Sequence, residues 1–382
     1  MRRLQPLAAS LLEWGCDLVL VVKDTQRARE VFSNKNMAVL PVPRVSLPSA
    51  PRFRHPHSFA GLAWNLGLND AASVAACVEN WKNLLVEIKP THVISDFGLL
   101  GSFVATALGI PTLRIGTGFG IPPQNQVLAS MFDQSVSTAE LDIAQKILDM
   151  VQAAATRSRL PEPRDWSALF ATEGPTLLVT VPDFDPYNEL RAREKHLGVW
   201  DHDEGCDPVW KNVDGPKTLA YLKSSPQLER QCSRLADLGL NLLVVRDGAP
   251  DGLRTIAGID RLNLSKDLVS LDKCSEICSL LVCNANHGIT LKSLSMGIPV
   301  ATFPLYLEQR WNARVLERLG LGVDLPVCPE GTWPERIDAL IHSPETRLEL
   351  ARYAEYLKHS NADALRNAVS ALAIWLEASY PT

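Results

Sequence analysis

An alternation of short apolar runs with helical segments constrains the fold of this 382-residue chain more than any other feature. The first run, Leu18–Val22, follows a helix-like segment from Leu4 to Leu12 that ends at Gly15. Its continuous apolar sequence predicts a strand that is covered on both faces. Further runs of this kind are Thr91–Ser95, Pro111–Ile115, Thr176–Val181, Thr218–Leu222, Asn241–Val245, Leu280–Cys283 and Val300–Phe303. Strands that alternate with helices at this spacing predict right-handed βαβ units and parallel sheets.

The length and one irregular segment predict the domain organisation. A chain of 382 residues is long for one domain. Segment 182–216 is rich in Asp, Pro, Trp and Gly without a sustained period, which indicates a linker. We therefore expect an α/β protein with Rossmann-like domains at 1–181 and 217–360, and a C-terminal helix at 361–382 that packs back on the first domain. Because the first strand of a doubly wound sheet is central, a chain that opens on a helix predicts a truncated first domain or a natural start upstream of Met1.

Composition argues against several classes of function. The formal net charge is −5 and no basic run stands out, so the signature of nucleic-acid binding is missing. The apolar runs are far shorter than the roughly 20 residues that cross a bilayer, and we expect a cytoplasmic protein without an integral membrane segment. The eight cysteines are scattered, which favours buried or partly buried free thiols. The spacing of Cys274, Cys278 and Cys283 matches no common zinc pattern, so we expect no metal site.

Polar residues cluster where the strand Leu280–Cys283 is followed by a helix. The sequence there runs Asn284-Ala285-Asn286-His287-Gly288-Ile289-Thr290. Free backbone N–H groups at the start of a helix attract phosphate, and Asn, His and Thr side chains add donors. A diphosphate is one predicted occupant. The alternative is that Asn284 or Asn286 only caps the helix.

The next strand also ends on polar residues. Glu308 and Gln309 follow the run Val300–Phe303, and Asn312 lies one turn further along a predicted helix. Such side chains can exchange hydrogen bonds with the vicinal hydroxyl groups of a sugar. The alternative is an ordinary helix N-terminus at which the dipole favours Glu308.

Both clusters belong to a longer pattern. The segment Leu280–Val323 resembles the donor-binding signature of the UDP-glycosyltransferase-like GT-B superfamily through His287-Gly288, Gly297-Ile298-Pro299-Val300, Pro304, Glu308-Gln309, Asn312-Ala313 and Leu319-Gly320. The first half resembles bacterial members through Ser95-Asp96-Phe97, Gly109-Ile110-Pro111 and Gly118-Phe119-Gly120-Ile121-Pro122-Pro123. The resemblance implies a GT-B fold, with two Rossmann-like domains that face each other across a cleft. It also implies an acceptor in the first domain and a nucleotide-sugar in the second.

The resemblance assigns ten positions to donor binding. They are Asn284, His287, Gly288, Thr290, Lys292, Glu308, Gln309, Asn312, Ser224 and Val269. By analogy with the family, the residues around His287 bind the diphosphate and Glu308–Gln309 bind the sugar. Ser224 approaches the phosphate, and the backbone at Val269 contacts the base.

Several positions depart from the family pattern. The family binds the diphosphate with a His whose place is taken by Asn284, which keeps a donor but cannot become cationic. Lys292 replaces the ribose-binding Glu, and an ammonium group has no acceptor. Lys292 could supply the positive charge that Asn284 lacks. Asn286 stands at the second family Gly and Ile289 at the first Thr.

The catalytic assignment is incomplete in this sequence. The family orients a base His with an Asp, and Asp96 matches that Asp, although it could instead cap the following helix. The His itself would fall at or before Met1. His55 and His57 lie in a Pro-rich loop from which they could reach the acceptor, or they are solvated loop residues. His196 has no catalytic context that the sequence can support.

The resemblance implies an inverting hexosyltransferase without a bound cofactor. A nucleotide-diphosphate-sugar would be the co-substrate, and the acceptor would be the hydroxyl group of a small molecule, lipid or glycan. Two alternatives remain open. One is a non-catalytic sugar-nucleotide-binding relic, and the other is a different GT-B enzyme such as a nucleotide-sugar 2-epimerase.

Overall fold

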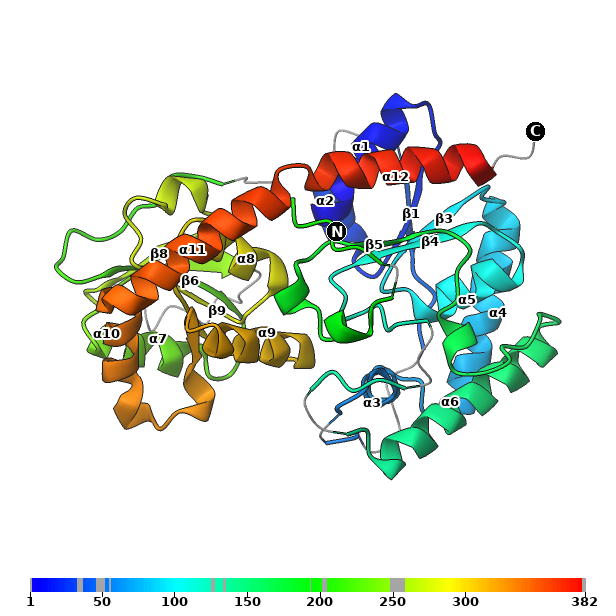
Figure 1. Cartoon of the computed structure of the whole chain (residues 1–382), viewed down its shortest axis with the longest axis horizontal. Helices are drawn as coiled ribbons and strands as arrows, with labels where there is room; N and C mark the ends of the chain where they lie inside the picture. Colours follow the sequence, from blue (N-terminus) through cyan, green and yellow to red (C-terminus); the bar gives the residue numbers. More distant parts are fainter. Residues whose placement is uncertain are drawn as a thin grey trace. The chain divides into compact units, whose positions relative to one another are not determined.

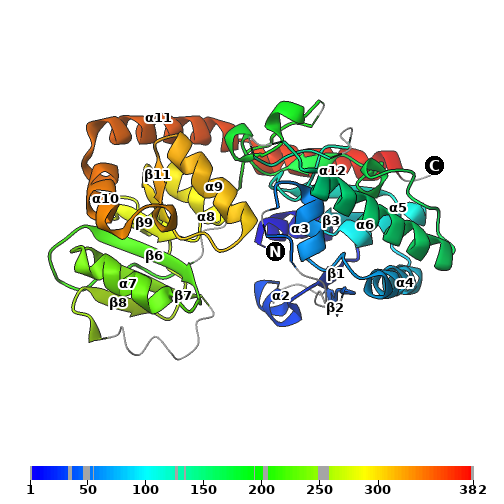
Figure 2. The same cartoon turned by 90° about the horizontal axis from the view of Figure 1, so that it is seen from below.

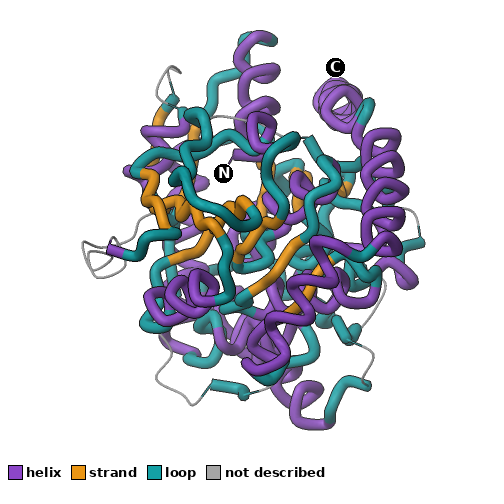
Figure 3. The backbone as a smooth tube through the Cα atoms, turned by 90° about the vertical axis from the view of Figure 1, so that its left-hand side faces the viewer, coloured by secondary structure: helices purple, strands orange, loops and turns teal. Residues whose placement is uncertain are grey.

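The computed structural model describes residues 2–32, 37–45, 52–54, 56–124, 128–132, 135–192, 194–200, 205–247 and 258–379. The chain divides into two compact units. The first unit contains Met1–Trp200 together with Asp363–Thr382, and the second contains Asp201–Ala362. Helices flank the strands in both units (Figures 1 and 3).

The first unit contains two separate parallel sheets. Its strands are β1 (Val19–Val22), β2 (Ala38–Pro41), β3 (Val93–Asp96), β4 (Thr112–Gly116) and β5 (Thr176–Leu178). Strands β1 and β2 pair with each other, and β3, β4 and β5 form a sheet in that order. All three pairings are parallel, as the alternating sequence predicts.

The prediction that Leu18–Val22 is covered on both faces is wrong. Within the described part of the chain, β1 pairs with β2 only, and Val19 is 39% exposed. A strand is buried on both faces when it lies inside a sheet that helices cover on both sides. Strand β4 is such a strand, because all five of its residues are buried.

Helices pack around both sheets of the first unit. They include η1 (Arg2–Leu4), α1 (Gln5–Glu13), α2 (Thr25–Val31), α3 (Phe59–Asn65), α4 (Ala71–Ile88), α5 (Leu99–Ala107), α6 (Thr138–Arg157) and α12 (Ala364–Ser379). Helix α2 packs against β2, and α5 packs against β3 and β4. Helices α4 and α6 lie side by side (Figures 1 and 2). Helix α12 packs against α1, and Leu372 and Trp375 share a buried cluster with Leu7 of α1 and Leu113 of β4. The C-terminal helix therefore contributes to the core of the first unit.

The second unit is built on one six-stranded parallel sheet. Its strands are β6 (Lys217–Lys223), β7 (Asn241–Asp247), β8 (Leu262–Ser265), β9 (Leu280–Cys283), β10 (Val300–Thr302) and β11 (Gly322–Asp324). Its helices include α7 (Leu228–Asp237), α8 (His287–Ser295), α9 (Leu307–Arg318), α10 (Trp333–His342) and α11 (Pro344–Asn361). The strand order is β11-β10-β9-β6-β7-β8. The chain winds outward from β6 in one direction and from β9 in the other, so the switch point lies between β6 and β9.

The structure adds elements that the sequence analysis did not predict. Strands β8 and β11 and helices α6 and α10 are the main additions. The predicted C-terminal helix at 361–382 corresponds to α12, which begins at Ala364 after a break that separates it from α11. Helix α8 begins at His287, within the polar cluster that follows Leu280–Cys283.

Candidate functional site

The carboxyl ends of three neighbouring strands are joined by the side chain of Asn284. Its Oδ1 accepts a hydrogen bond from the backbone N–H of Lys223 at 2.7 Å, and its Nδ2 donates to the carbonyl oxygen of Phe303 at 2.7 Å. Asn284 is only 2% exposed. Because Lys223 ends β6 and Phe303 follows β10, this amide fixes the ends of β6, β9 and β10 at the switch point. The donor that Asn284 retains is therefore used within the protein.

The turn between β9 and α8 has a strained backbone. Ala285 adopts a φ of 58°, in the left-handed region, and its side chain is fully buried. A residue with a Cβ costs about 1–2 kcal/mol in that conformation. Asn286 stands at the N-cap of α8, but its side chain makes no capping hydrogen bond. The alternative in which Asn284 or Asn286 caps the helix through its side chain is therefore wrong, because both side chains bond elsewhere.

Helix α9 holds the same turn from the other side. Gln309 Nε2 donates to Asn286 Oδ1 at 2.6 Å, while its Oε1 accepts from the backbone N–H groups of Leu305 and Tyr306 at 2.7 and 3.1 Å. Asn312 Nδ2 donates to the carbonyl oxygen of Ala285 at 2.9 Å. Among the described residues, the buried Oδ1 of Asn312 has no hydrogen-bond partner. The turn and the start of α9 thus form one connected polar unit.

The other predicted residues of α8 differ in how far they reach solvent. Thr290 is fully buried, with its Oγ1 3.9 Å from Cys283 Sγ, and His287 is 8% exposed. Gly288 is exposed. Lys292 forms an ion pair with Asp272, so its charge is already partnered on the protein side.

The remaining predicted donor residues lie on neighbouring loops. Ser224 is exposed and directly follows β6, while Glu308 is half-buried in the first turn of α9. Val269 is buried and forms a bridge with Cys206, and Cys206 N donates to the carbonyl oxygen of Leu268 at 2.8 Å. Cys206 is itself exposed, which corrects the prediction that every thiol is at least partly buried.

A cation that the sequence had not indicated lies at the switch point. Lys223 is exposed at the end of β6, and its Nζ lies 5.3 Å from the centre of the Tyr306 ring. The Tyr306 ring is 60% exposed and stands directly before α9. A signal existed in the sequence, because Lys223 directly precedes Ser224, which the resemblance had assigned to the phosphate.

Asp96 ends β3 in the first unit. Its Oδ2 lies 3.3 Å from Nε of Arg3, and these two side chains are 18% and 31% exposed. Gly98 is the N-cap of α5 and no side chain caps that helix, so Asp96 does not act as its cap. His55 lies outside the described residues. His57 donates its backbone N–H to Glu140 at 2.8 Å, and its ring packs edge-on against Phe132.

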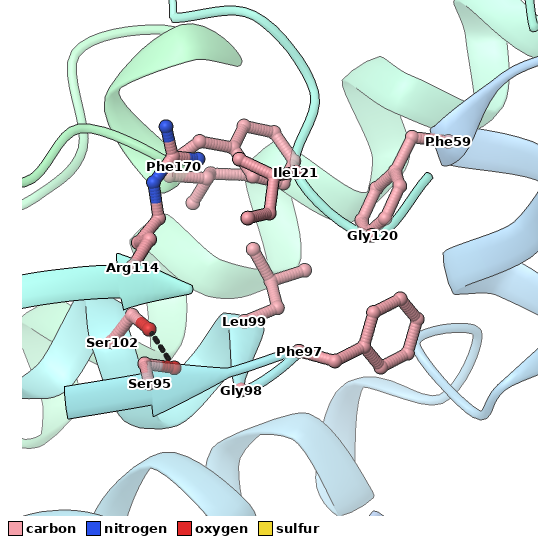
Figure 4. A pocket seen from close by; sticks show the side chains of 11 residues that line it. Phe59, Ser95, Phe97, Gly98, Leu99, Ser102, Arg114, Gly120, Ile121 and Phe170 are labelled. Carbon is pink, nitrogen blue, oxygen red and sulfur yellow. Dashed lines mark hydrogen bonds between the residues drawn. The ribbon is translucent and has the colours of Figure 1, made fainter. Parts of the chain in front are cut away.

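A small cavity of about 20 Å³, which is room for about one water molecule, lies next to β3, β4 and α5 (Figure 4). Its lining is formed by Phe59, Ser95, Phe97, Gly98, Leu99, Ser102, Arg114, Gly120, Ile121, Leu169 and Phe170. Phe97 adopts a φ of 61° and remains 47% exposed. Strained residues of this kind are concentrated at functional sites. The sequence had not indicated this pocket, because it combines segments that lie far apart along the chain.

A buried ionic cluster lies next to the loop that follows β4. Asp185 accepts hydrogen bonds from His196 Nε2 at 2.9 Å and from Arg191 Nε at 2.8 Å. Burial alone would raise the pKa of Asp185, but the hydrogen bonds from His196 and Arg191 outweigh it and hold that pKa below its usual value. Arg191 Nη2 also donates to the carbonyl oxygen of Gly118 at 3.4 Å. His196 therefore has a structural context that the sequence did not reveal.

Solved structures of known proteins match this architecture over nearly its whole length. A structure titled as the glycotransferase of kitacinnamycin superposes with a TM-score of 0.72 at 14% identity, covering 98% of this chain and 95% of that one. The chain has the GT-B fold. A Streptomyces glycosyltransferase complexed with thymidine diphosphate matches this GT-B chain with a TM-score of 0.61 at 17% identity, over 96% and 95% of the two chains. The predicted fold class is confirmed.

Curated relatives of this GT-B chain are distant in sequence, and no protein-family model matches it. A PGL/p-HBAD biosynthesis glycosyltransferase of Mycobacterium tuberculosis is 26% identical over 262 residues, which are 63% of this chain and 60% of that protein. A PGL/p-HBAD biosynthesis rhamnosyltransferase of Mycobacterium bovis is 25% identical over 267 residues, 64% and 58% of the two chains. The chain thus spans about three fifths of the relatives that it matches.

Two further observations concern the described part of the chain. No helix there has the length and apolar character needed to span a membrane. No group of three or more His, Cys, Asp or Glu side chains in that part could hold a metal ion.

Proposed function

We propose that this chain is an inverting glycosyltransferase that moves a hexose from a nucleotide-diphosphate-sugar to a hydroxyl group of its acceptor. The observation that carries the proposal is the polar switch point of the second sheet, where Asn284 joins three strand ends directly before α8. Ligands of doubly wound sheets bind outside such a point. The distant relatives carry the names of glycosyltransferases, and the Streptomyces enzyme is complexed with thymidine diphosphate, which supports a nucleotide-diphosphate donor.

The first turn of α8 is assigned to the two phosphates. Backbone N–H groups at a helix start and the helix dipole both favour an anion, and the dipole would stabilise the leaving diphosphate. His287, Gly288 and Thr290 belong to this turn, and Ser224 lies on the adjoining loop after β6. We assign the cationic contact to Lys223, because Asn284 is neutral and is used by the protein itself.

The rest of the donor is assigned to the neighbouring loops. Glu308 is proposed to accept hydrogen bonds from the sugar hydroxyl groups, while Gln309 and Asn312 hold the turn against which the sugar lies. The backbone at Val269 is proposed to contact the base. Lys292 is assigned to the edge of the site, where its ion pair with Asp272 fixes its position.

The acceptor is assigned to the first unit. The position of Asp96 at the carboxyl end of β3 supports this placement, because ligands of open parallel sheets bind at that edge. In the role that the resemblance implies, Asp96 orients the base that removes the proton from the acceptor hydroxyl. The hydroxyl oxygen then displaces the nucleoside diphosphate at the anomeric carbon.

Binding and turnover of nucleotide-sugars test the proposal. The full chain is expected to melt at a higher temperature with thymidine- or uridine-diphosphate sugars, and to release the nucleoside diphosphate slowly in water. Lys223→Met should weaken donor binding about fivefold to tenfold, equivalent to about 1–1.4 kcal/mol. Lys358→Met is the matched control, because that side chain is 78% exposed on α11. The absence of any thermal shift or donor hydrolysis across the panel would contradict the proposal.

A second candidate is a sugar-nucleotide-binding protein without turnover. The ion pairs Arg3–Asp96 and Lys292–Asp272 favour it, because each engages a residue that the resemblance assigned to the reaction or the donor. It predicts a thermal shift with nucleotide-sugars, but no release of nucleoside diphosphate with any acceptor. The Arg3→Ala variant separates the candidates, because it frees Asp96. If the chain is a transferase, the kcat of this variant should differ from that of the parent chain. If the chain only binds nucleotide-sugars, the variant should stay inactive.

A further inference from the structure

One histidine of the first unit is held by a buried carboxylate on one side and reaches solvent on the other. His196 Nε2 lies 2.9 Å from Asp185 Oδ2, and the Asp185 side chain is fully buried, whereas the His196 side chain is 13% exposed. In the described part of the chain, Nδ1 of His196 makes no hydrogen bond, yet it is not among the buried polar atoms that lack a partner, so it reaches solvent. A histidine with this arrangement can take up a proton at its free nitrogen.

The carboxylate of Asp185 is fixed both in position and in charge. Nε and Nη2 of Arg191 donate to its two oxygens at 2.8 and 3.1 Å, and the backbone N–H of Tyr187 donates at 3.0 Å. Burial opposes the charge, but the hydrogen bonds from His196 and Arg191 outweigh it and hold the pKa of Asp185 below its usual value. The carboxylate is therefore ionised at neutral pH. Its hydrogen bond selects the tautomer of His196 in which Nε2 carries the proton and Nδ1 carries the lone pair.

The backbone of His196 is held against the sheet. His196 forms a parallel bridge with Leu178, the last residue of β5. The backbone N–H of Leu197 donates to the carbonyl oxygen of Leu178 at 2.9 Å, and that of Gly198 donates to Thr180 at 3.1 Å. The segment that carries His196 therefore continues the sheet beside the carboxyl end of β5. A side chain on such a fixed segment keeps its geometry better than one on a free loop.

The pair of Asp185 and His196 lies at the same edge of the sheet as Asp96. Gly116 ends β4, and an ideal Cβ there would lie 3.9 Å from Asp96 Oδ1, while an ideal Cβ at Gly118 would lie 2.6 Å from Oδ1 of Asp185. The two aspartates therefore flank one short loop at the carboxyl end of β4, where ligands of open parallel sheets bind. Asp96 is paired with Arg3, which leaves the orienting role to Asp185.

We propose that His196, oriented by Asp185, is the general base of the glycosyl transfer. This inference rests on the proposed function, because it names the base of that reaction. Nδ1 of His196 takes the proton of the attacking hydroxyl group while the hydroxyl oxygen forms a bond to the anomeric carbon. The bond from that carbon to the phosphate oxygen breaks, and its electron pair leaves with the nucleoside diphosphate. The imidazolium that forms is stabilised by the carboxylate of Asp185.

Two acceptors that differ in a proton test this inference on the full chain. Water must lose a proton when it attacks the sugar, whereas azide carries none. The release of nucleoside diphosphate from uridine- and thymidine-diphosphate-glucose is measured with each acceptor. His196→Gln keeps an amide donor for Asp185 but cannot act as a base. It should lower the kcat with water about 100-fold or more and leave the KM for the donor unchanged, because a positioned base contributes about 10²–10⁴-fold. With azide, the variant should regain the rate of the parent chain.

Further variants separate a catalytic role of His196 from a structural one. His342→Gln is the matched control, because that side chain is 54% exposed on α10 and the variant should keep the full rate with water. If His196→Gln does not fold, His196→Asn leaves the pair of Arg191 and Asp185 in place and carries the same expectation. A folded variant that retains the rate with water overturns the inference. A loss of rate that azide does not restore also overturns it, because the side chain then acts only on the structure.

The failure of this inference can be distinguished from the failure of the proposed function. If the parent chain releases nucleoside diphosphate and the His196 variants release it equally fast with water, only the assignment of the base is wrong. If the parent chain releases no nucleoside diphosphate with water or with azide, the proposed function is wrong and the inference falls with it.

Discussion

A methyl group added at Gly118 would enter the buried ionic cluster of the first unit. The residue adopts a φ of 85°, and an ideal Cβ would lie 2.6 Å from both Cγ and Oδ1 of Asp185. Asp185 cannot move away easily, because it is 3% exposed and is held by Arg191 and His196. The Gly118→Ala substitution should therefore destabilise the loop that follows β4.

The magnitude follows from two separate contributions. A Cβ in the left-handed region costs about 1–2 kcal/mol, and forcing extra atoms into a packed interior costs about 1–3 kcal/mol. The lower entropy of the unfolded Ala chain returns about 0.4–1 kcal/mol. We expect a net loss of about 3 kcal/mol. Gly109 provides the control, because its φ is 73° and an added Cβ would meet nothing within 4 Å. Gly109→Ala should therefore cost only about 1 kcal/mol.

Urea unfolding measures the free-energy differences, and hydrogen exchange of peptides from 112–121 assigns them to the first unit. The double variant Gly118→Ala/Asp185→Ala isolates the contact. In the Asp185→Ala background, Gly118→Ala should lower the free energy of unfolding only as much as Gly109→Ala lowers it in the parent chain. The difference, about 2 kcal/mol, is the coupling energy of a double-mutant cycle. Equal costs for Gly118→Ala and Gly109→Ala would refute the reasoning, because the clash with Asp185 would then contribute nothing.

Three other changes are expected to have measurable effects. Burial raises the pKa of Asp324 to about 6. The protonated carboxyl group therefore stabilises the folded state below about pH 4, and this stabilisation is lost as the pH rises through 6. Asp324→Asn should therefore be about 1 kcal/mol more stable than the parent above pH 6 in urea unfolding, with a difference that shrinks toward pH 4. Gln309→Leu should lower the free energy of unfolding by about 2 kcal/mol, because the backbone N–H groups of Leu305 and Tyr306 lose their acceptor. Urea unfolding measures this loss. The exposed Cys206 should react first with a thiol reagent, and Cys206→Ser should remove the fast phase, whereas Cys283 should react slowly because burial raises its pKa to about 11.

The sequence predicted four of the six parallel strands of the second unit, and the polar cluster that it placed after Leu280–Cys283 lies at the switch point. Continuous apolar runs such as Leu280–Cys283 are recognisable, and the polar residues after them mark the carboxyl ends. Strand β8 mixes apolar with polar residues, and β11 has a single apolar residue between Gly322 and Asp324, so neither forms a continuous apolar run. Helix α6 is different, because a signal was present. Ser137 and Glu140 form a capping box, and buried Ile143, Ile147 and Val151 follow at helical spacing.

The contacts of the candidate sites could not be predicted in the same way. Asn284 was interpreted as a ligand residue that had lost its charge, but its partners Lys223 and Phe303 are 61 and 19 positions away. The pocket around Arg114 and the Asp185 cluster likewise bring together segments that only the tertiary fold places in contact. Local sequence patterns specify elements and their polar ends, whereas the hydrogen-bond partner of a buried polar group depends on the whole fold.

That dependence provides a physical criterion for ranking the candidate residues. Asn284 and Gln309 have both their donors and their acceptors engaged within the protein, so substituting them should reduce stability more than it reduces ligand affinity. Among the residues that the structure describes, Arg114 and Asn312 are buried with polar atoms that have no hydrogen-bond partner. A buried polar group that the fold does not satisfy carries a cost, and a ligand that supplies the missing partner removes that cost. Substituting Arg114, whose side chain makes one hydrogen bond among the described residues, should therefore cost less stability than substituting Asn284, which serves two backbone groups.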